Sequence, residues 1–423
     1  MNLVDFLWLL VFVSLIFLSV EISRRVFGHW FTPLSIFVGI NSLSLSGYHL
    51  RLLEMPDVSF KVHALLLSAF GMFSCGVFLA VGRRPEGLQL STKPPLAVTG
   101  LNGFFYTTVV LATIGWVVQG ALLVMKIGLG GLLRNIWVLQ SEFQVQFVGY
   151  LNMLGILVFP LFVLRMAVGS VKKVDYLLVL ATLFGLLLAG IKGYMIYSVF
   201  GGAYVWSVTR PDKFRMVHLA GGVAVVIGFF IIYAARVDIF ATDFYVGTGL
   251  MKRLPALHLP YLYFVGSWPA LDFIVDGAVA DLPRLGTTVL QPMWKLLGAA
   301  GVVDYALVTQ PFVSVGKFTF NVFSLVGEVY WDLKWPGVLA VAFLLGLIPT
   351  RLYLRIWKCD HWGHVMVYAV VVHGLFISFF SFIYNFNVYV LLLYIFVVGF
   401  VIPRRGILVR HQPGGGKLPD SER

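Results

Sequence analysis

The chain contains long, nearly uninterrupted apolar segments, and these restrict its fold more than any other feature of the sequence. Eleven of them approach the roughly 17–25 apolar residues that a helix needs to cross a bilayer. Only helices and closed barrels satisfy their backbone hydrogen bonds inside a membrane. The sequence therefore predicts an all-α, polytopic integral membrane protein with about eleven transmembrane helices. The predicted spans are residues 3–20, 32–50, 60–81, 102–125, 147–165, 175–190, 194–209, 216–234, 336–353, 364–383 and 387–403.

Composition excludes the other broad classes of protein. Hydrophobic residues make up 59% of the 423 residues and charged residues 12%, whereas soluble domains average roughly 45–50% apolar and about 25% charged residues. So much apolar surface also excludes an intrinsically disordered chain. The two cysteines, Cys75 and Cys359, provide neither a disulfide framework nor the spacing of a zinc site.

Basic residues alternate between the two ends of the predicted spans. One set of connections is rich in Lys and Arg: Arg24 and Arg25; Arg83, Arg84 and Lys93; Arg165, Lys172 and Lys173; Arg210, Lys213 and Arg215; Arg351, Arg355 and Lys358; and the tail from Arg404. The positive-inside rule makes this set cytoplasmic, which places the N-terminus outside and the C-terminus inside. The net charge of +12 is thus a topological signal, and a nucleic-acid partner is not expected. Asp5 among the leading residues of the first span, with no basic residue before it, and Arg24-Arg25 after the span favour a reverse-oriented anchor over a cleavable signal peptide.

Residues 1–403 form a single predicted transmembrane domain, and residues 404–423 form a predicted disordered cytoplasmic tail. Between the eighth and ninth spans, about 100 residues from Ala235 to Trp335 form a large loop on the non-cytoplasmic side. Connections in helical bundles are mostly about 2–8 residues long, and much longer ones tend to be functional. The loop is therefore the first place to look for a site.

This outer loop is predicted to carry short amphipathic or re-entrant helices. Residues 261–271 are too short to span and suit a re-entrant or interfacial helix. Residues 284–295 suit an ordered surface segment, and residues 317–332 suit another short helix, after which Pro336 opens the ninth span. Five polar residues of this last helix share one predicted stripe: Lys317, Asn321, Ser324, Glu328 and Asp332. Such a stripe either faces solvent or lines a substrate groove.

The sequence contains no signature of a soluble enzyme. It has no Walker loop, no dinucleotide-binding fingerprint, no Gly-x-Ser-x-Gly elbow and no His or Cys cluster with metal spacing. His63, His218 and His373 are interpreted as packing or boundary histidines. Neither a metal nor another cofactor is expected.

The non-cytoplasmic side instead offers three kinds of side chain. Cations there can hold an anionic lipid headgroup or simply extend toward water: Lys192, Arg236, Arg134, Arg284 and Lys317. Carboxylates can act as a general base or have a structural role: Asp238, Asp243, Asp272, Asp276, Glu328 and Asp332. Aromatic residues can stack on sugars or form an interfacial belt: Tyr245, Tyr261, Tyr263, Trp268, Trp294, Trp331 and Trp335.

Several stretches, in order, resemble the bacterial oligosaccharide repeat-unit polymerases, the Wzy-type family that includes O-antigen polymerases. Residues 189–194 resemble the family's Gly-Ser-Arg turn, with Lys192 in place of the usual Arg, and 200–204 resemble the Gly-rich span that follows. Residues 263–271, with Gly266-Ser267, resemble the tyrosine-bearing outer helix, and Leu285-Gly286-Thr287-Thr288 with Pro292 follow as in relatives. Phe320-Asn321-Val322-Phe323-Ser324, Tyr330-Trp331-Asp332, Gly337 and Leu345-Gly346 resemble the Asn-containing helix and the span after it.

The resemblance implies a glycosyltransferase of the bacterial inner membrane whose active face is periplasmic. It would polymerise undecaprenyl-diphosphate-linked oligosaccharide units, both donor and acceptor, for O-antigen, capsule or exopolysaccharide, with a chain-length regulator protein as a further partner. The catalytic candidates are Arg236, Asp238, Glu328 and Asp332. The substrate-binding candidates are Lys192, Arg284, Lys317, Asn321, Tyr263, Ser267 and Trp268.

Two alternatives stay open at the level of sequence. A ligase that transfers finished glycan would share the outer loop and the lipid donor. A flippase or secondary transporter for lipid-linked sugars would place charges at mid-membrane near broken helices. The predicted spans are nearly free of charge, which favours an enzyme over a transporter.

Overall fold

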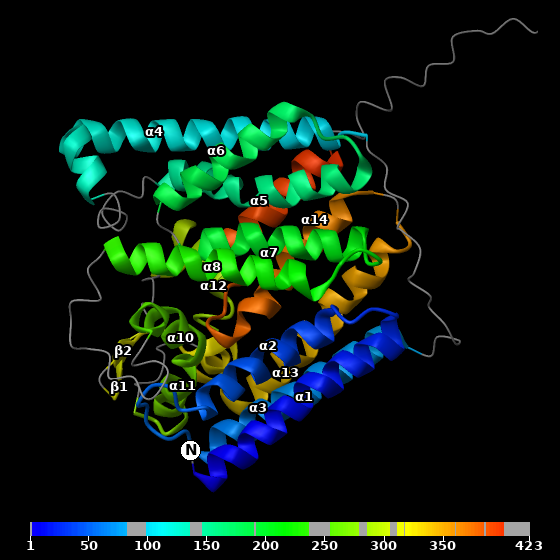
Figure 1. The fold of residues 1–423 in the computed structure, drawn as a ribbon, viewed down its shortest axis with the longest axis vertical. Helices are drawn as coiled ribbons and strands as arrows, with labels where there is room; N and C mark the ends of the chain where they lie inside the picture. Colours follow the sequence, from blue (N-terminus) through cyan, green and yellow to red (C-terminus); the bar gives the residue numbers. More distant parts are fainter. Residues whose placement is uncertain are drawn as a thin grey trace, which may run out of the picture.

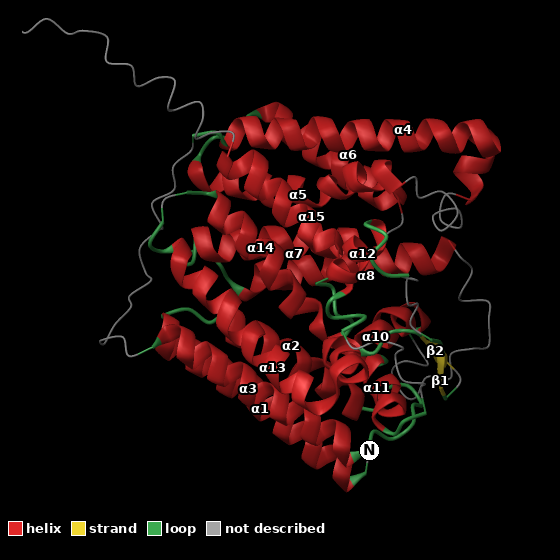
Figure 2. Cartoon of the chain, turned by 180° about the vertical axis from the view of Figure 1, so that it is seen from behind, coloured by secondary structure: helices red, strands yellow, loops and turns green. Residues whose placement is uncertain are grey.

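The computed structural model describes residues 2–82, 99–135, 146–189, 192–236, 254–278, 286–304, 311–316, 318–359, 361–384 and 386–401. These residues are mostly helical, and the axes of the long helices are roughly aligned with one another, whichever way the chain runs (Figures 1 and 2). The disordered tail predicted at 404–423 lies outside the described residues.

One layer of the bundle contains α1 (Leu3–Phe27), α2 (Pro33–His49), α3 (Phe60–Val81) and α13 (Ser324–Ile356), the lower group in Figure 1. α1 begins where the Asn2 side chain accepts a hydrogen bond from the Asp5 backbone N–H at 2.8 Å, as expected for an N-cap. It ends at Gly28, whose φ of 69° is left-handed and is readily adopted by glycine. Pro33 then opens α2, where a missing N–H has no cost.

α3 and α13 approach each other through glycines. A Cβ atom added to Gly76 would meet the Phe343 carbonyl oxygen, and one added to Gly346 would meet the Phe73 carbonyl oxygen. Small residues that let two backbones approach closely are typical of helix contacts inside membranes.

The opposite layer contains α4 (Leu101–Asn135), α5 (Gln146–Val168) and α6 (Lys173–Ala189). Between the layers lie α7 (Lys192–Thr209), α8 (Met216–Arg236) and α14 (Gly363–Phe376), as Figure 1 shows. A 3₁₀ turn (Ile377–Phe379) follows α14, and α15 (Phe386–Tyr394) continues into a π-helical segment (Ile395–Val401). α4 is broken at Gly128, where φ is 69° and ψ is 164°.

The large loop forms short elements, most of which lie at the end of the bundle where α1 begins (Figures 1 and 2). They are a 3₁₀ turn (Pro255–Leu257), α10 (His258–Val265), α11 (Ser267–Val275), α12 (Gln291–Ala299), β1 (Val313–Val315) and β2 (Phe318–Phe320). α12, by contrast, lies beside α8 and contacts α15 (Figures 1 and 2). The two strands pair antiparallel, with Val313 opposite Phe320. α10 packs on α2 and α8, and α11 packs on α3 and α13.

The predicted helix over 317–332 is wrong in its first half. Residues 318–320 form strand β2, and α13 starts only at Ser324. The alternating Phe-Thr-Phe of β2 finds a partner in the Val-Ser-Val of β1, which supplies the pairing that a strand needs. The predicted five-residue helical stripe is therefore wrong, because Asn321 precedes the helix. Lys317 lies outside the described residues. The break before Pro336 is present, at Lys334 with φ 55° and ψ −163°.

The predicted span positions coincide with helices α1 to α8, the second half of α13, and the segments containing α14 and α15. Within the described residues, five helices are long and apolar enough to cross a membrane: Leu3–Phe27, Phe60–Val81, Leu101–Lys126, Val148–Val168 and Ser324–Ile356. Large apolar side chains also face outward, such as Phe17 on α1, 71% exposed, and Leu177 on α6, 68% exposed. The structure thus supports a helical membrane protein, and the count of eleven spans remains a prediction.

Candidate functional site

An apolar cavity of about 690 Å³ lies among α2, α5, α7, α8, α10 and the chain from α14 to α15. Its volume falls within the roughly 300–1,000 Å³ that small-molecule sites occupy. The wall includes the polar side-chain atoms of Tyr261, Tyr263, His373 and Ser381. Most of the remaining wall is aliphatic or phenylalanine, so the cavity suits a hydrocarbon chain.

Two predicted cationic positions lie at the same end of the α7–α8 pair, two helices that line the cavity. α7 and α8 pack side by side (Figure 1) and are joined by the short connection at 210–215, so they run antiparallel. Lys192 is the first residue of α7 and Arg236 is the last residue of α8, which puts both backbones at the same end of the pair. Gly193, the next residue of α7, lines the cavity. α10 packs on α8 and supplies cavity-lining residues of its own.

Of the three candidates on α10 and α11, only Tyr263 lines the cavity. Its ring stacks on Phe380 at 5.3 Å between centroids, and burial raises the pKa of its hydroxyl. Ser267 is buried and donates to the Phe379 carbonyl oxygen. Trp268 is fully buried, and its Nε1–H donates to the Ser44 hydroxyl at 2.7 Å. The structure therefore places Ser267 and Trp268 inside the protein, where they fix α11 against the bundle.

Glu328 lies directly behind the cavity wall. Its side chain is buried, and one carboxylate oxygen accepts hydrogen bonds from the Ser381 hydroxyl at 2.7 Å and the Phe382 backbone N–H at 3.0 Å. Ser381 itself lines the cavity. Glu328 thus connects α13 to the irregular segment that forms part of the wall.

Asp332, one turn further along α13, is used differently. Its carboxylate accepts four hydrogen bonds of 2.9–3.0 Å, from the backbone N–H groups of Thr287, Thr288 and Val289 and from the Thr288 hydroxyl. An ionised carboxylate offers about four lone-pair positions. Oδ2 accepts three of these bonds and Oδ1 accepts one, so Asp332 holds the turn at 286–290, which favours an anchoring role over proton transfer.

Of the other predicted site residues, the structure describes one and leaves three outside the described residues. Asn321 lies half-buried in the connection between β2 and α13. Asp238, Arg284 and Lys317 lie outside the described residues.

His373 is a wall residue whose position the sequence did not reveal. It is 2% exposed and lies on α14, with its ring centroid 3.8 Å from that of Tyr197. Within the described part of the chain, its Nδ1 has no hydrogen-bond partner. The sequence predicts a packing or boundary histidine at this position, although an ionisable residue inside an otherwise apolar span is a functional hypothesis by default.

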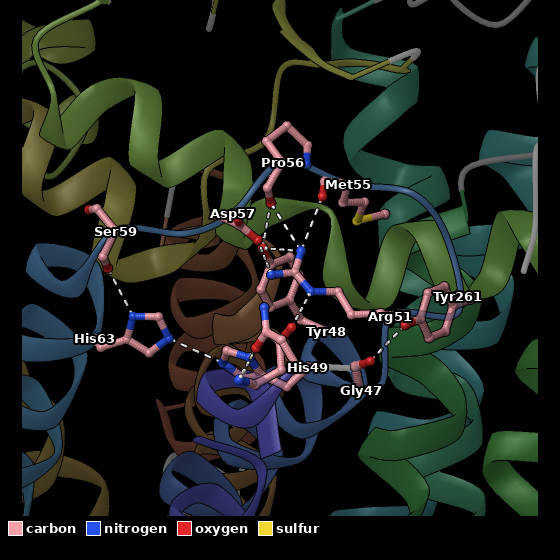
Figure 3. Close-up of polar contacts among 12 residues, drawn as sticks. Gly47, Tyr48, His49, Arg51, Met55, Pro56, Asp57, Ser59, His63 and Tyr261 are labelled. Carbon is pink, nitrogen blue, oxygen red and sulfur yellow. Dashed lines mark hydrogen bonds and ion pairs between the residues drawn. The ribbon is translucent and has the colours of Figure 1, made fainter. Parts of the chain in front are cut away.

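A second polar cluster, also missed, lies where α1 begins, α2 ends and α3 begins (Figure 3). Asp5 accepts from His49 Nδ1 at 2.9 Å and from Arg51 Nε at 3.1 Å. The Nε2 atoms of His49 and His63 are 3.1 Å apart, and His63 Nδ1 is 2.9 Å from the Ser59 carbonyl oxygen. The available signal was Asp5 within an apolar helix, but the spacing of the two histidines gave no hint that they meet.

No group of three or more His, Cys, Asp or Glu side chains that could hold a metal ion occurs among the residues that the structure describes. Searches against protein-family models, curated proteins and solved structures find no match for the chain.

Proposed function

We propose that the protein is a membrane glycosyltransferase that polymerises polyprenyl-diphosphate-linked oligosaccharide units on the outer side of a bacterial inner membrane. The observation that carries the proposal is the apolar cavity, which is lined by α7 and α8, the helices that begin at Lys192 and end at Arg236. A polyprenyl diphosphate has the matching chemistry, with a long hydrocarbon chain and an anionic head.

The proposed reaction requires no cofactor, because the leaving group is already on the lipid. The acceptor sugar's hydroxyl oxygen bonds to the anomeric carbon of the donor, and the bond from that carbon to the diphosphate oxygen breaks with its electron pair. Arg236 and Lys192 stabilise the departing diphosphate, Arg through forked hydrogen bonds. Glu328 or Asp238 takes the hydroxyl proton. Asp332 keeps the 286–290 turn in place.

The cavity can be tested by filling it. Val226 on α8 lines the cavity, whereas its neighbour Val225 is 52% exposed on the outer surface of the helix. In cells whose only copy of the gene carries Val226→Trp, we expect the polymer ladder to collapse to single repeat units. Val225→Trp is the matched control and should leave the ladder unchanged.

Binding gives a second, direct measurement. Native mass spectrometry of the purified protein with undecaprenyl diphosphate should detect a one-to-one adduct for the wild type and for Val225→Trp but not for Val226→Trp. A full ladder and an unchanged adduct in Val226→Trp would show that the lipid does not occupy this cavity.

The cationic end is tested by Arg236→Ala, which should abolish long-chain polymer and leave single capped units. Unchanged polymer length would refute the role of Arg236. The product also separates the alternatives, since a lost ligase leaves no glycan on the final acceptor at all. A lost flippase would leave the lipid-linked unit on the cytoplasmic leaflet.

A further inference from the structure

Three buried side chains from three helices make a continuous row of contacts where α1 begins, and Figure 3 labels two of them, His49 and His63. Asp5, His49 and His63 are 4%, 2% and 1% exposed. The row runs from Asp5 to His49 Nδ1 at 2.9 Å, from His49 Nε2 to His63 Nε2 at 3.1 Å, and from His63 Nδ1 to the Ser59 carbonyl oxygen at 2.9 Å. Each contact has the length of a hydrogen bond.

Counting hydrogen atoms along this row shows that one more is needed than neutral histidines supply. A carbonyl oxygen only accepts, so His63 Nδ1 must carry a hydrogen atom. A neutral imidazole has one N–H, so two of them supply two hydrogen atoms. The three contacts need three hydrogen atoms. With only two hydrogen atoms, one contact would place two lone pairs against each other at hydrogen-bond distance.

The additional proton belongs to the histidines rather than to the aspartate. Arg51 donates from Nε to the second oxygen of Asp5 at 3.1 Å, and a guanidinium favours the ionised form of a carboxylate. We propose that His49 and His63 together bind one proton, shared between their Nε2 atoms, and that Asp5 is its counterion. This proposal is independent of the reaction proposed above.

Burial opposes a positive charge, so the surroundings must offset that cost. Asp5 is in direct contact with His49, and the Trp8 ring stacks on His63 at 4.1 Å between centroids. An aromatic face attracts a cation placed over it. Arg51 is balanced in turn by Asp57, to which it also donates. The cluster of Asp5, the histidine pair, Arg51 and Asp57 is then neutral overall.

The other ionisable groups facing the row come from α2, α3 and α11. The Tyr48 hydroxyl accepts from Arg51 at 3.0 Å. Asp272 on α11 accepts from the Ser59 hydroxyl and backbone N–H. Lys61 on α3 pairs with Asp276 on α11 at 3.3 Å. The proton site therefore joins α1, α2 and α3 at the point where α11 is attached.

Nitrogen-15 NMR of histidine-labelled, full-length protein in nanodiscs tests the proton count at pH 7.5. The signals of His49 and His63 are assigned by comparison with His49→Gln and His63→Gln. We expect one unprotonated ring nitrogen among the four of the pair, or an averaged signal for the two Nε2 atoms. His218, which is exposed, serves as the internal reference. Two unprotonated nitrogens in the pair would overturn the proposal.

Zinc titration supplies an independent check, because a metal would need both Nε2 lone pairs. We expect no stoichiometric zinc binding that depends on His49. One equivalent of zinc bound by the wild type and lost in His49→Gln would overturn the shared proton in favour of a metal.

The pH dependence of thermal unfolding gives the sign of the effect. A proton bound more tightly in the folded chain than in the unfolded one stabilises the fold fully below about pH 6.5, and this contribution is lost as the pH rises past the folded site's own midpoint. The melting temperature of the wild type should therefore fall more steeply between pH 7 and 9 than that of His49→Gln. His218→Gln should follow the wild type. Equal slopes for the wild type and His49→Gln would contradict the proposal.

Discussion

The contact between α3 and α13 allows a sharp test of how this bundle is held together. In Gly76→Ala, the three atoms nearest to the new Cβ are all backbone atoms, with the Phe343 carbonyl oxygen the closest and Leu347 N at 2.9 Å. Real Cβ contacts below 3.0 Å are essentially never seen. Backbone atoms cannot rotate away as a flexible side chain can, so the two helices must separate along their contact.

Overpacking of a well-packed interior costs about 1–3 kcal/mol, and the rigid obstacle puts Gly76→Ala at the upper end of that range. Replacing a helical glycine by alanine also gains roughly 0.5–1 kcal/mol from the unfolded chain and helix propensity. Gly71 on the same helix isolates that gain, because a Cβ there meets nothing within 4 Å.

The measurement is the temperature at which the detergent-solubilised protein loses its monodisperse peak in size-exclusion chromatography. Gly76→Ala should melt well below the wild type, and Gly71→Ala should melt at or slightly above it. Equal melting temperatures for the two variants would refute the close helix approach inferred here.

Two further predictions concern buried carboxylates. Asp175→Asn removes the charge that pairs with Arg165 at 2.9 Å, where both side chains are fully buried. Breaking a buried ion pair costs about 3–5 kcal/mol, so the variant should melt far below the wild type. An unchanged melting temperature would contradict the pairing. Asp332→Asn sets an amide N–H against backbone donors and leaves about one of them unsatisfied, at a cost of about 1–3 kcal/mol. Limited proteolysis should then cut the 286–290 turn faster than in the wild type. If the rate of cleavage is unchanged but the cells make no long-chain polymer, Asp332 would instead be catalytic.

The helix positions could be predicted because a span needs a length of apolar sequence, which is visible residue by residue. The break before Pro336 was visible for the same local reason, since proline opens a helix more readily than it continues one. The structure adds the non-helical conformation of Lys334, which ends the first half of α13.

The hairpin before α13 could not be predicted in the same way. Residues 317–332 fit helical spacing when considered alone, but strand β2 depends on its pairing with residues 313–315. A local pattern does not contain that partner. The same reason explains Asp332, whose role is set by the turn at 287–289, some 45 positions away in the sequence.

Some residues of the candidate site could likewise be predicted from the sequence and others could not. Tyr263 could be found from the outer-loop helix and lines the cavity, whereas Ser267 and Trp268 were equally prominent in sequence but are buried. The shape of a cavity depends on seven or more segments meeting, and the meeting of His49 with His63 depends on how α2 and α3 pack. Neither can be read from residue spacing.

One hydroxyl connects the proton site with the cavity. Tyr261 lines the cavity, and its hydroxyl donates to the Gly47 carbonyl oxygen at 2.6 Å and accepts from the Leu52 N–H at 3.4 Å. Burial raises the pKa of Tyr261 to about 12, so the hydroxyl keeps its proton and donates at every physiological pH. Gly47 lies two residues before His49 on the same helix, so the segment that carries the proton site also holds one wall of the cavity.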